Sequence, residues 1–63
     1  MSIATKIDEI AAHLQLIRQY VVLIDANNFE EATVTDMKGN AKDTCDTAKA
    51  DIDAIKSLID EWS

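Results

Sequence analysis

The chain has 63 residues, a formal net charge of −6, one Gly, one Cys and no Pro. A chain of this length forms one domain and buries too little of its own surface to be very stable alone. A single cysteine cannot form an internal disulfide, which argues against a disulfide-stabilised secreted scaffold. Twelve acidic residues against six basic ones argue against direct nucleic-acid binding, which needs a basic surface.

The sequence also argues against membrane insertion and secretion. Its longest uninterrupted apolar run covers residues 20–24, whereas a membrane-spanning helix needs about 20 apolar residues. Near the N-terminus, Lys6 is followed by Asp8 and Glu9, and no continuous apolar stretch of the kind found in signal peptides is present. We therefore expect an intracellular, cytoplasmic protein.

The first predicted element is a helix over about residues 2–26. Its apolar residues recur at alternating spacings of four and three, which places them in one row, or seam, along a helix face. They are Ile3, Ile7, Ile10, Leu14, Ile17, Val21 and Ile24. Ser2 can cap the helix with its hydroxyl group, and Asn27 and Asn28 tolerate the backbone conformation that ends helices.

Residues 27–35 lack a long-range period, and their β-branched residues indicate a connection or a short helical turn. The same alternating spacing then returns. Its members are Ala41, Cys45, Ala48, Ile52, Ile55, Ile59 and Trp62. The start of this helix is open between about residues 33 and 40, because Thr35 or Asp36 can cap a helix that tolerates Gly39, and Asn40 can cap one that starts after it. We favour the earlier start and expect a helix over about residues 36–62.

Two long helices with one short connection predict an all-α fold, an antiparallel two-helix hairpin with coiled-coil-like heptads in a single domain over residues 1–63. Each helix also carries apolar residues beside its seam. These are Leu16, Tyr20 and Leu23 in the first helix and Ala50, Ala54 and Leu58 in the second. Two helices that contact only each other cannot cover so wide an apolar arc, which is typical of helices in a larger bundle. We therefore predict an intermolecular interface made by Leu16, Tyr20, Leu23, Ala54 and Leu58.

Residue patterns that carry chemistry are weak in this sequence. Glu9 and His13 share a helix face, but the Glu-x-x-His spacing and the several carboxylate-bearing helices of di-iron bundles are missing. The carboxylates of the second helix alternate with lysines at surface spacing, whereas acid–base catalysis needs sheltered carboxylates. Cys45 lies among alanines, where a thiol acts as a small apolar group. We expect no enzymatic activity, no metal and no cofactor.

The opening Met-Ser-Ile-Ala-x-Lys-Ile-x-x-Ile, continuing to His13-Leu14, resembles the N-terminal helices of small phage and prophage tail- or virion-associated proteins. It covers about 14 of 63 residues. The resemblance implies a phage or prophage origin and a structural or accessory role, in the virion or the host cytoplasm, and it identifies no functional residue.

Two functions compatible with these observations belong to different classes. The first is a non-enzymatic assembly module that binds a second copy of itself or another protein through apolar helix faces. The alternative is a small acidic inhibitor of the phage anti-defence type that blocks a basic nucleic-acid-handling protein. Residues 25–63 support the alternative, because they contain ten acidic and four basic residues.

Overall fold

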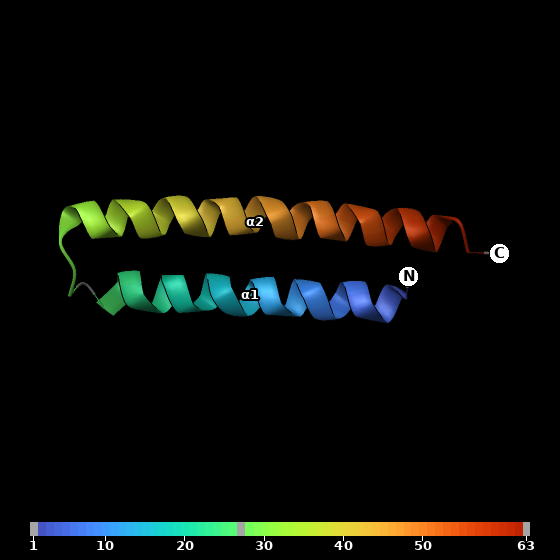
Figure 1. Ribbon diagram of the computed structural model, residues 1–63, viewed down its shortest axis with the longest axis horizontal. Coiled ribbons are helices and arrows are strands. Elements are labelled where there is room, and N and C mark those ends of the chain that lie inside the picture. The colour runs from blue at the N-terminus through green and yellow to red at the C-terminus, as the bar shows by residue number, and fades with distance from the viewer. Residues whose placement is uncertain (1, 27, 63) are drawn as a thin grey trace.

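A computed structural model describes residues 2–26 and 28–62 of the protein. It contains helix α1 (Ile3–Ala26) and helix α2 (Glu31–Asp60). The helices lie side by side and antiparallel in a rod (Figure 1), whose Cα atoms extend over 52 × 14 × 14 Å. The predicted all-α antiparallel hairpin is therefore confirmed. Neither helix is both long and apolar enough to cross a membrane.

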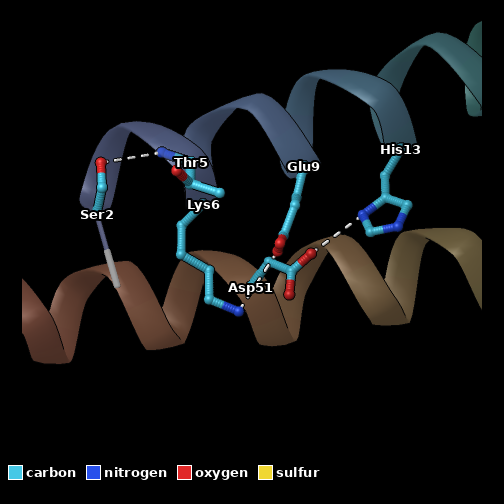
Figure 2. A network of polar contacts seen from close by, with 6 residues as sticks. All are labelled: Ser2, Thr5, Lys6, Glu9, His13 and Asp51. Carbon is cyan, nitrogen blue, oxygen red and sulfur yellow. Dashed lines mark hydrogen bonds and ion pairs between the residues drawn. The ribbon is translucent and has the colours of Figure 1, made fainter.

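Helix α1 has the boundaries that its sequence predicts. The backbone N–H of Thr5 donates a hydrogen bond to Ser2 Oγ over 3.3 Å (Figure 2), which confirms the predicted cap. This bond satisfies one of the backbone donors that the first helical turn leaves free. The helix ends at Ala26. The helix-ending role predicted for Asn27 lies outside the described residues.

Helix α2 begins at Glu31, five residues before the predicted start at residue 36. The backbone at Glu30 is extended (φ −64°, ψ 152°), and its carbonyl accepts the first helical hydrogen bond from the N–H of Val34 over 3.0 Å. The β-branched residues of this segment each cost only a few tenths of a kcal/mol in a helix. Met37 is buried and Val34 half-buried, and this burial offsets the cost, so part of the predicted connection is helical.

The C-terminal end of α2 is shorter than predicted. The helix ends at Asp60 instead of residue 62, and Glu61 closes it by donating its backbone N–H to the Ser57 carbonyl over 3.1 Å. Trp62 follows the helix with 74% of its surface exposed. It therefore does not pack in the seam, where its spacing had placed it.

The buried and half-buried residues show which helix faces meet. Along α1 they are Ile3, Lys6, Ile10, His13, Ile17, Tyr20 and Ile24. Along α2 they recur at spacings of three and four from Val34 to Leu58, as Val34, Met37, Ala41, Thr44, Ala48, Asp51, Ile55 and Leu58, with Ala54 half-buried beside them. This pattern confirms half of the predicted seam. The confirmed residues are Ile3, Ile10, Ile17 and Ile24 in α1 and Ala41, Ala48 and Ile55 in α2.

The other half of the predicted seam is wrong. Ile7, Leu14 and Val21 of α1 and Ile52 and Ile59 of α2 are each between 50% and 55% exposed, and Cys45 is exposed as well. The residue immediately before each of them occupies the seam instead. At about 100° per residue, this exchange corresponds to a rotation of each helix by roughly 50° about its axis.

Candidate interaction surface

Five aliphatic side chains form the largest uncovered apolar feature that can be traced along both helices. Ile7, Leu14 and Val21 recur every seven residues along α1, and Ile52 and Ile59 do so along α2. All five are about half exposed. Residues seven apart lie on the same side of a helix that takes part in a heptad seam. We call these five residues the exposed apolar face.

The two halves of this face lie on the same side of the hairpin. Two antiparallel helices are related by an approximate two-fold axis perpendicular to the plane that contains them. Rotation about this axis exchanges the helices but keeps each side of the plane in place. Residues at matching positions of the two helices therefore lie on the same side of the hairpin. Each of the five residues comes directly after a half-buried residue of the seam in its own helix, as Leu14 follows His13 and Ile52 follows Asp51. Nδ1 of His13 lies 3.1 Å from Oδ2 of Asp51, which sets the two helices in register and places Leu14 beside Ile52.

The borders of the exposed apolar face differ between the helices. Along α2 its outer edge is basic, because Lys42, Lys49 and Lys56 are exposed and lie one helical turn before Cys45, Ile52 and Ile59. Along α1 the equivalent edge carries the exposed Ala4 and Ala11, followed by Arg18 and Asp25. The face is thus bordered by long cations on one helix, and by two alanines, one cation and one anion on the other.

The five interface residues predicted from the sequence differ in how far the hairpin itself covers them. Tyr20 and Leu58 are half-buried in the seam between the helices. Leu16 and Leu23 are 38% and 42% exposed and, together with the half-buried Ala54, lie on the side of the hairpin opposite the exposed apolar face. That an additional chain covers these residues stays a prediction.

The sequence does not reveal the exposed apolar face, because the heptad spacing places its residues in the seam. Helix α1 carries three neighbouring rows of residues spaced seven apart, each named after its first residue. The rows of Ile3 (Ile3, Ile10, Ile17, Ile24) and Ile7 (Ile7, Leu14, Val21) are apolar, and the row of Lys6 (Lys6, His13, Tyr20) is partly apolar. Any two adjacent rows can pair with another helix. The signal that would have found the face is the presence of a third row, which is typical of helices inside a bundle.

A polar contact between the helices joins His13 and Asp51, whose side chains are 30% and 17% exposed. The two facing atoms are almost completely shielded from water, and among the described residues neither makes a hydrogen bond, so their 3.1 Å contact is a close polar approach only. Figure 2 shows that the pair links α1 to α2, whereas Glu9, the partner considered for His13 as a metal ligand, lies 3.4 Å from Nζ of Lys6. The pair therefore joins the two helices.

A catalytic or metal-binding role is not supported by the surroundings of this pair. Cys45 is six residues from Asp51, which is about 9 Å along the helix, so its thiol is not adjacent to the imidazole. Within residues 2–26 and 28–62, no group of three or more His, Cys, Asp or Glu side chains is placed to hold a metal ion. A shallow depression on α1, lined by Arg18, Gln19, Val22 and Leu23, is formed by one helix and is open to solvent.

Comparison with protein-family models, curated proteins and solved structures gives no match for this chain. The resemblance of its first helix to phage and prophage proteins therefore stays a prediction.

Proposed function

We propose that this protein is a non-enzymatic assembly module, which associates through the aliphatic side chains that its own hairpin leaves uncovered. One observation carries the proposal. The seam between the helices contains the polar residues Lys6, His13 and Asp51, whereas the neighbouring aliphatic rows are outside it. Burial of apolar surface alone would favour the opposite rotation of the helices. An additional protein surface on the exposed apolar face removes this conflict.

The small core supports the same proposal. Ile10, Met37 and Ala48 are the buried apolar residues of the described part of the chain, with 9%, 8% and 4% of their surfaces exposed. Chains with fewer than about 70 to 80 residues commonly add a partner chain to gain stability. A partner bound to the exposed apolar face would form a second layer of protein on the hairpin. The aliphatic side chains between the two layers would then enlarge the hydrophobic core.

The phage-like opening of the sequence extends this proposal to a structural or accessory role in a virion or in the host cytoplasm. The competing function, an acidic inhibitor, has support from Asp46, Asp53 and Asp60, which are exposed at successive turns of α2. The row of lysines headed by Lys42 runs beside these carboxylates, however, and interrupts the acidic surface that would imitate a phosphate backbone. We therefore favour assembly through apolar contacts.

The test compares two double variants in an extract of the source cell by size-exclusion chromatography. Leu14→Gln/Ile52→Gln removes apolar surface, and Asp46→Asn/Asp53→Asn removes two carboxylates from the outer side of the same hairpin. The proposal expects the tagged wild-type chain to elute in a complex that resists high salt and is lost only in the glutamine variant. A complex that is lost in the asparagine variant and in high salt would support the inhibitor instead. Elution of the wild type as a free 7.0 kDa chain would contradict both functions.

A further inference from the structure

We infer that the exposed apolar face binds the same face of a second copy of this chain, so that two hairpins form a symmetric four-helix bundle. This inference rests on the proposed function and names its partner. Isologous contact between identical faces is the commonest way in which soluble proteins dimerise. Here both helices of the hairpin contribute aliphatic residues at the same spacing of seven, so two copies can pack row against row.

The surface area of the hairpin matches the requirement of such a dimer. The chain exposes 4857 Å², whereas a compact monomer of 7.0 kDa exposes about 4,000 Å². The excess of about 800 Å² equals the surface that each partner buries in a standard protein–protein interface. The radius of gyration of 14.8 Å, against about 11 Å for a compact chain of 63 residues, shows that the excess comes from the rod shape. Two rods side by side remove it.

The charged border decides between the two possible dimer symmetries. If the two-fold axis crosses the helices, each α2 packs on the α2 of the second copy, and two rows of Lys42, Lys49 and Lys56 face each other. If the axis runs parallel to the helices, each α2 packs on α1 of the second copy. The lysine row then faces an edge of small alanines with one cation and one anion, as described above. Like charges in close contact are unfavourable, so the second arrangement is the one we propose.

The proposed arrangement places both connections between α1 and α2 at the same end of the bundle. All neighbouring helices are then antiparallel, as in up-down-up-down four-helix bundles. In the rejected arrangement the connections are at opposite ends, separated by about the length of α2, whose 30 residues span about 45 Å. The position of the connections is therefore a direct measure of the symmetry.

The first experiment measures the mass of the purified full chain by light scattering over a range of micromolar concentrations. We expect a dimer of about 14 kDa, twice the 7.0 kDa of one chain. Leu14→Gln/Ile52→Gln should raise the dimer Kd at least about 100-fold, because the two copies together lose four aliphatic side chains near the centre of the interface. The matched control is Leu16→Gln/Leu23→Gln on the opposite side of the hairpin, which should change Kd by less than about threefold. Circular dichroism of both variants checks that the helices are retained.

The second experiment measures the distance between spin labels in the dimer. The label is attached to Asn28→Cys in a Cys45→Ser background, since Asn28 is exposed in the connection and the background leaves one thiol per chain. Light scattering first confirms that the labelled chain still dimerises. Helices pack about 10 Å apart, so we expect labels within roughly 25 Å of each other. A distance of about 40 Å or more would overturn the proposed axis.

The remaining outcomes separate this inference from the proposed function. A monomer at all concentrations, or dissociation caused only by the Leu16→Gln/Leu23→Gln variant, would overturn the inference. If the purified chain is a monomer but elutes from the cell extract in a complex that Leu14→Gln/Ile52→Gln abolishes, the module binds a different protein and the proposed function holds. If the chain also elutes freely from the extract, the proposed function fails too.

Discussion

The polar pair in the seam allows a sharp test of what stabilises the hairpin. We consider replacement of His13 and Asp51 by leucine, singly and together. Nδ1 of His13 and Oδ2 of Asp51 are 3.1 Å apart and nearly inaccessible to water. Asp51→Leu would leave the imidazole nitrogen without its polar neighbour, which costs about 1–3 kcal/mol. Burial of most of the new leucine returns about 1.5–2 kcal/mol, so we expect this single variant to be nearly as stable as wild type or slightly less stable.

The double variant should behave differently, because it removes both polar groups and adds two leucines to the seam. Replacement of two facing buried polar groups by apolar residues ranges from nearly neutral to stabilising, and for ion pairs the gain is about 1–4 kcal/mol. Both side chains are partly exposed here, at 30% and 17%, so we expect a gain in the lower half of this range. The difference between the double variant and the sum of the single variants gives the coupling energy of the pair.

The assay is urea unfolding followed by far-UV circular dichroism, at two protein concentrations. Association adds stability that depends on concentration, but His13 and Asp51 lie in the seam and not on the exposed apolar face. The coupling energy should therefore be the same at both concentrations. A double variant that is less stable than wild type would refute this expectation, because it would show that the pair stabilises the hairpin beyond what apolar contacts in its place supply.

Three further predictions concern helix α2. Met37→Ala should destabilise the hairpin by about 2–3 kcal/mol because Met37 is 8% exposed, whereas Lys38→Ala on the exposed neighbour should stay within about 0.5 kcal/mol; equal thermal melts would place the start of α2 after Met37. Gly39→Ala should stabilise the protein by about 0.5–1 kcal/mol, because no atom lies within 4 Å of the added Cβ, and a lower urea midpoint would contradict this. Ala48→Leu should cost about 1–3 kcal/mol by separating the helices at a position that is 4% exposed, and Ala50→Leu on the exposed side is the control for the same change of residue type.

The sequence by itself determined the number, type and approximate length of the helices. Repeats of three and four residues specify an amphipathic helix, and Ser2 marks its beginning with a side chain that satisfies a free backbone donor. One short connection between two long helices leaves few arrangements besides an antiparallel hairpin. The start of α2 was harder to locate, because the segment around Val34 has β-branched residues whose weak helix preference is outweighed by burial that only the folded hairpin creates.

The tertiary structure alone decided which faces of the helices meet. Periodicity identifies the side of a helix that is apolar, but it does not choose between two adjacent pairs of rows when three rows are wholly or partly apolar. In α1 the row headed by Ile3 belongs to both possible seams, and its contact with α2 was predicted correctly. The rows headed by Lys6 and Ile7 compete for the second place. That choice depends on contacts across the pair, such as the one between His13 and Asp51, whose residues are 38 positions apart in the sequence.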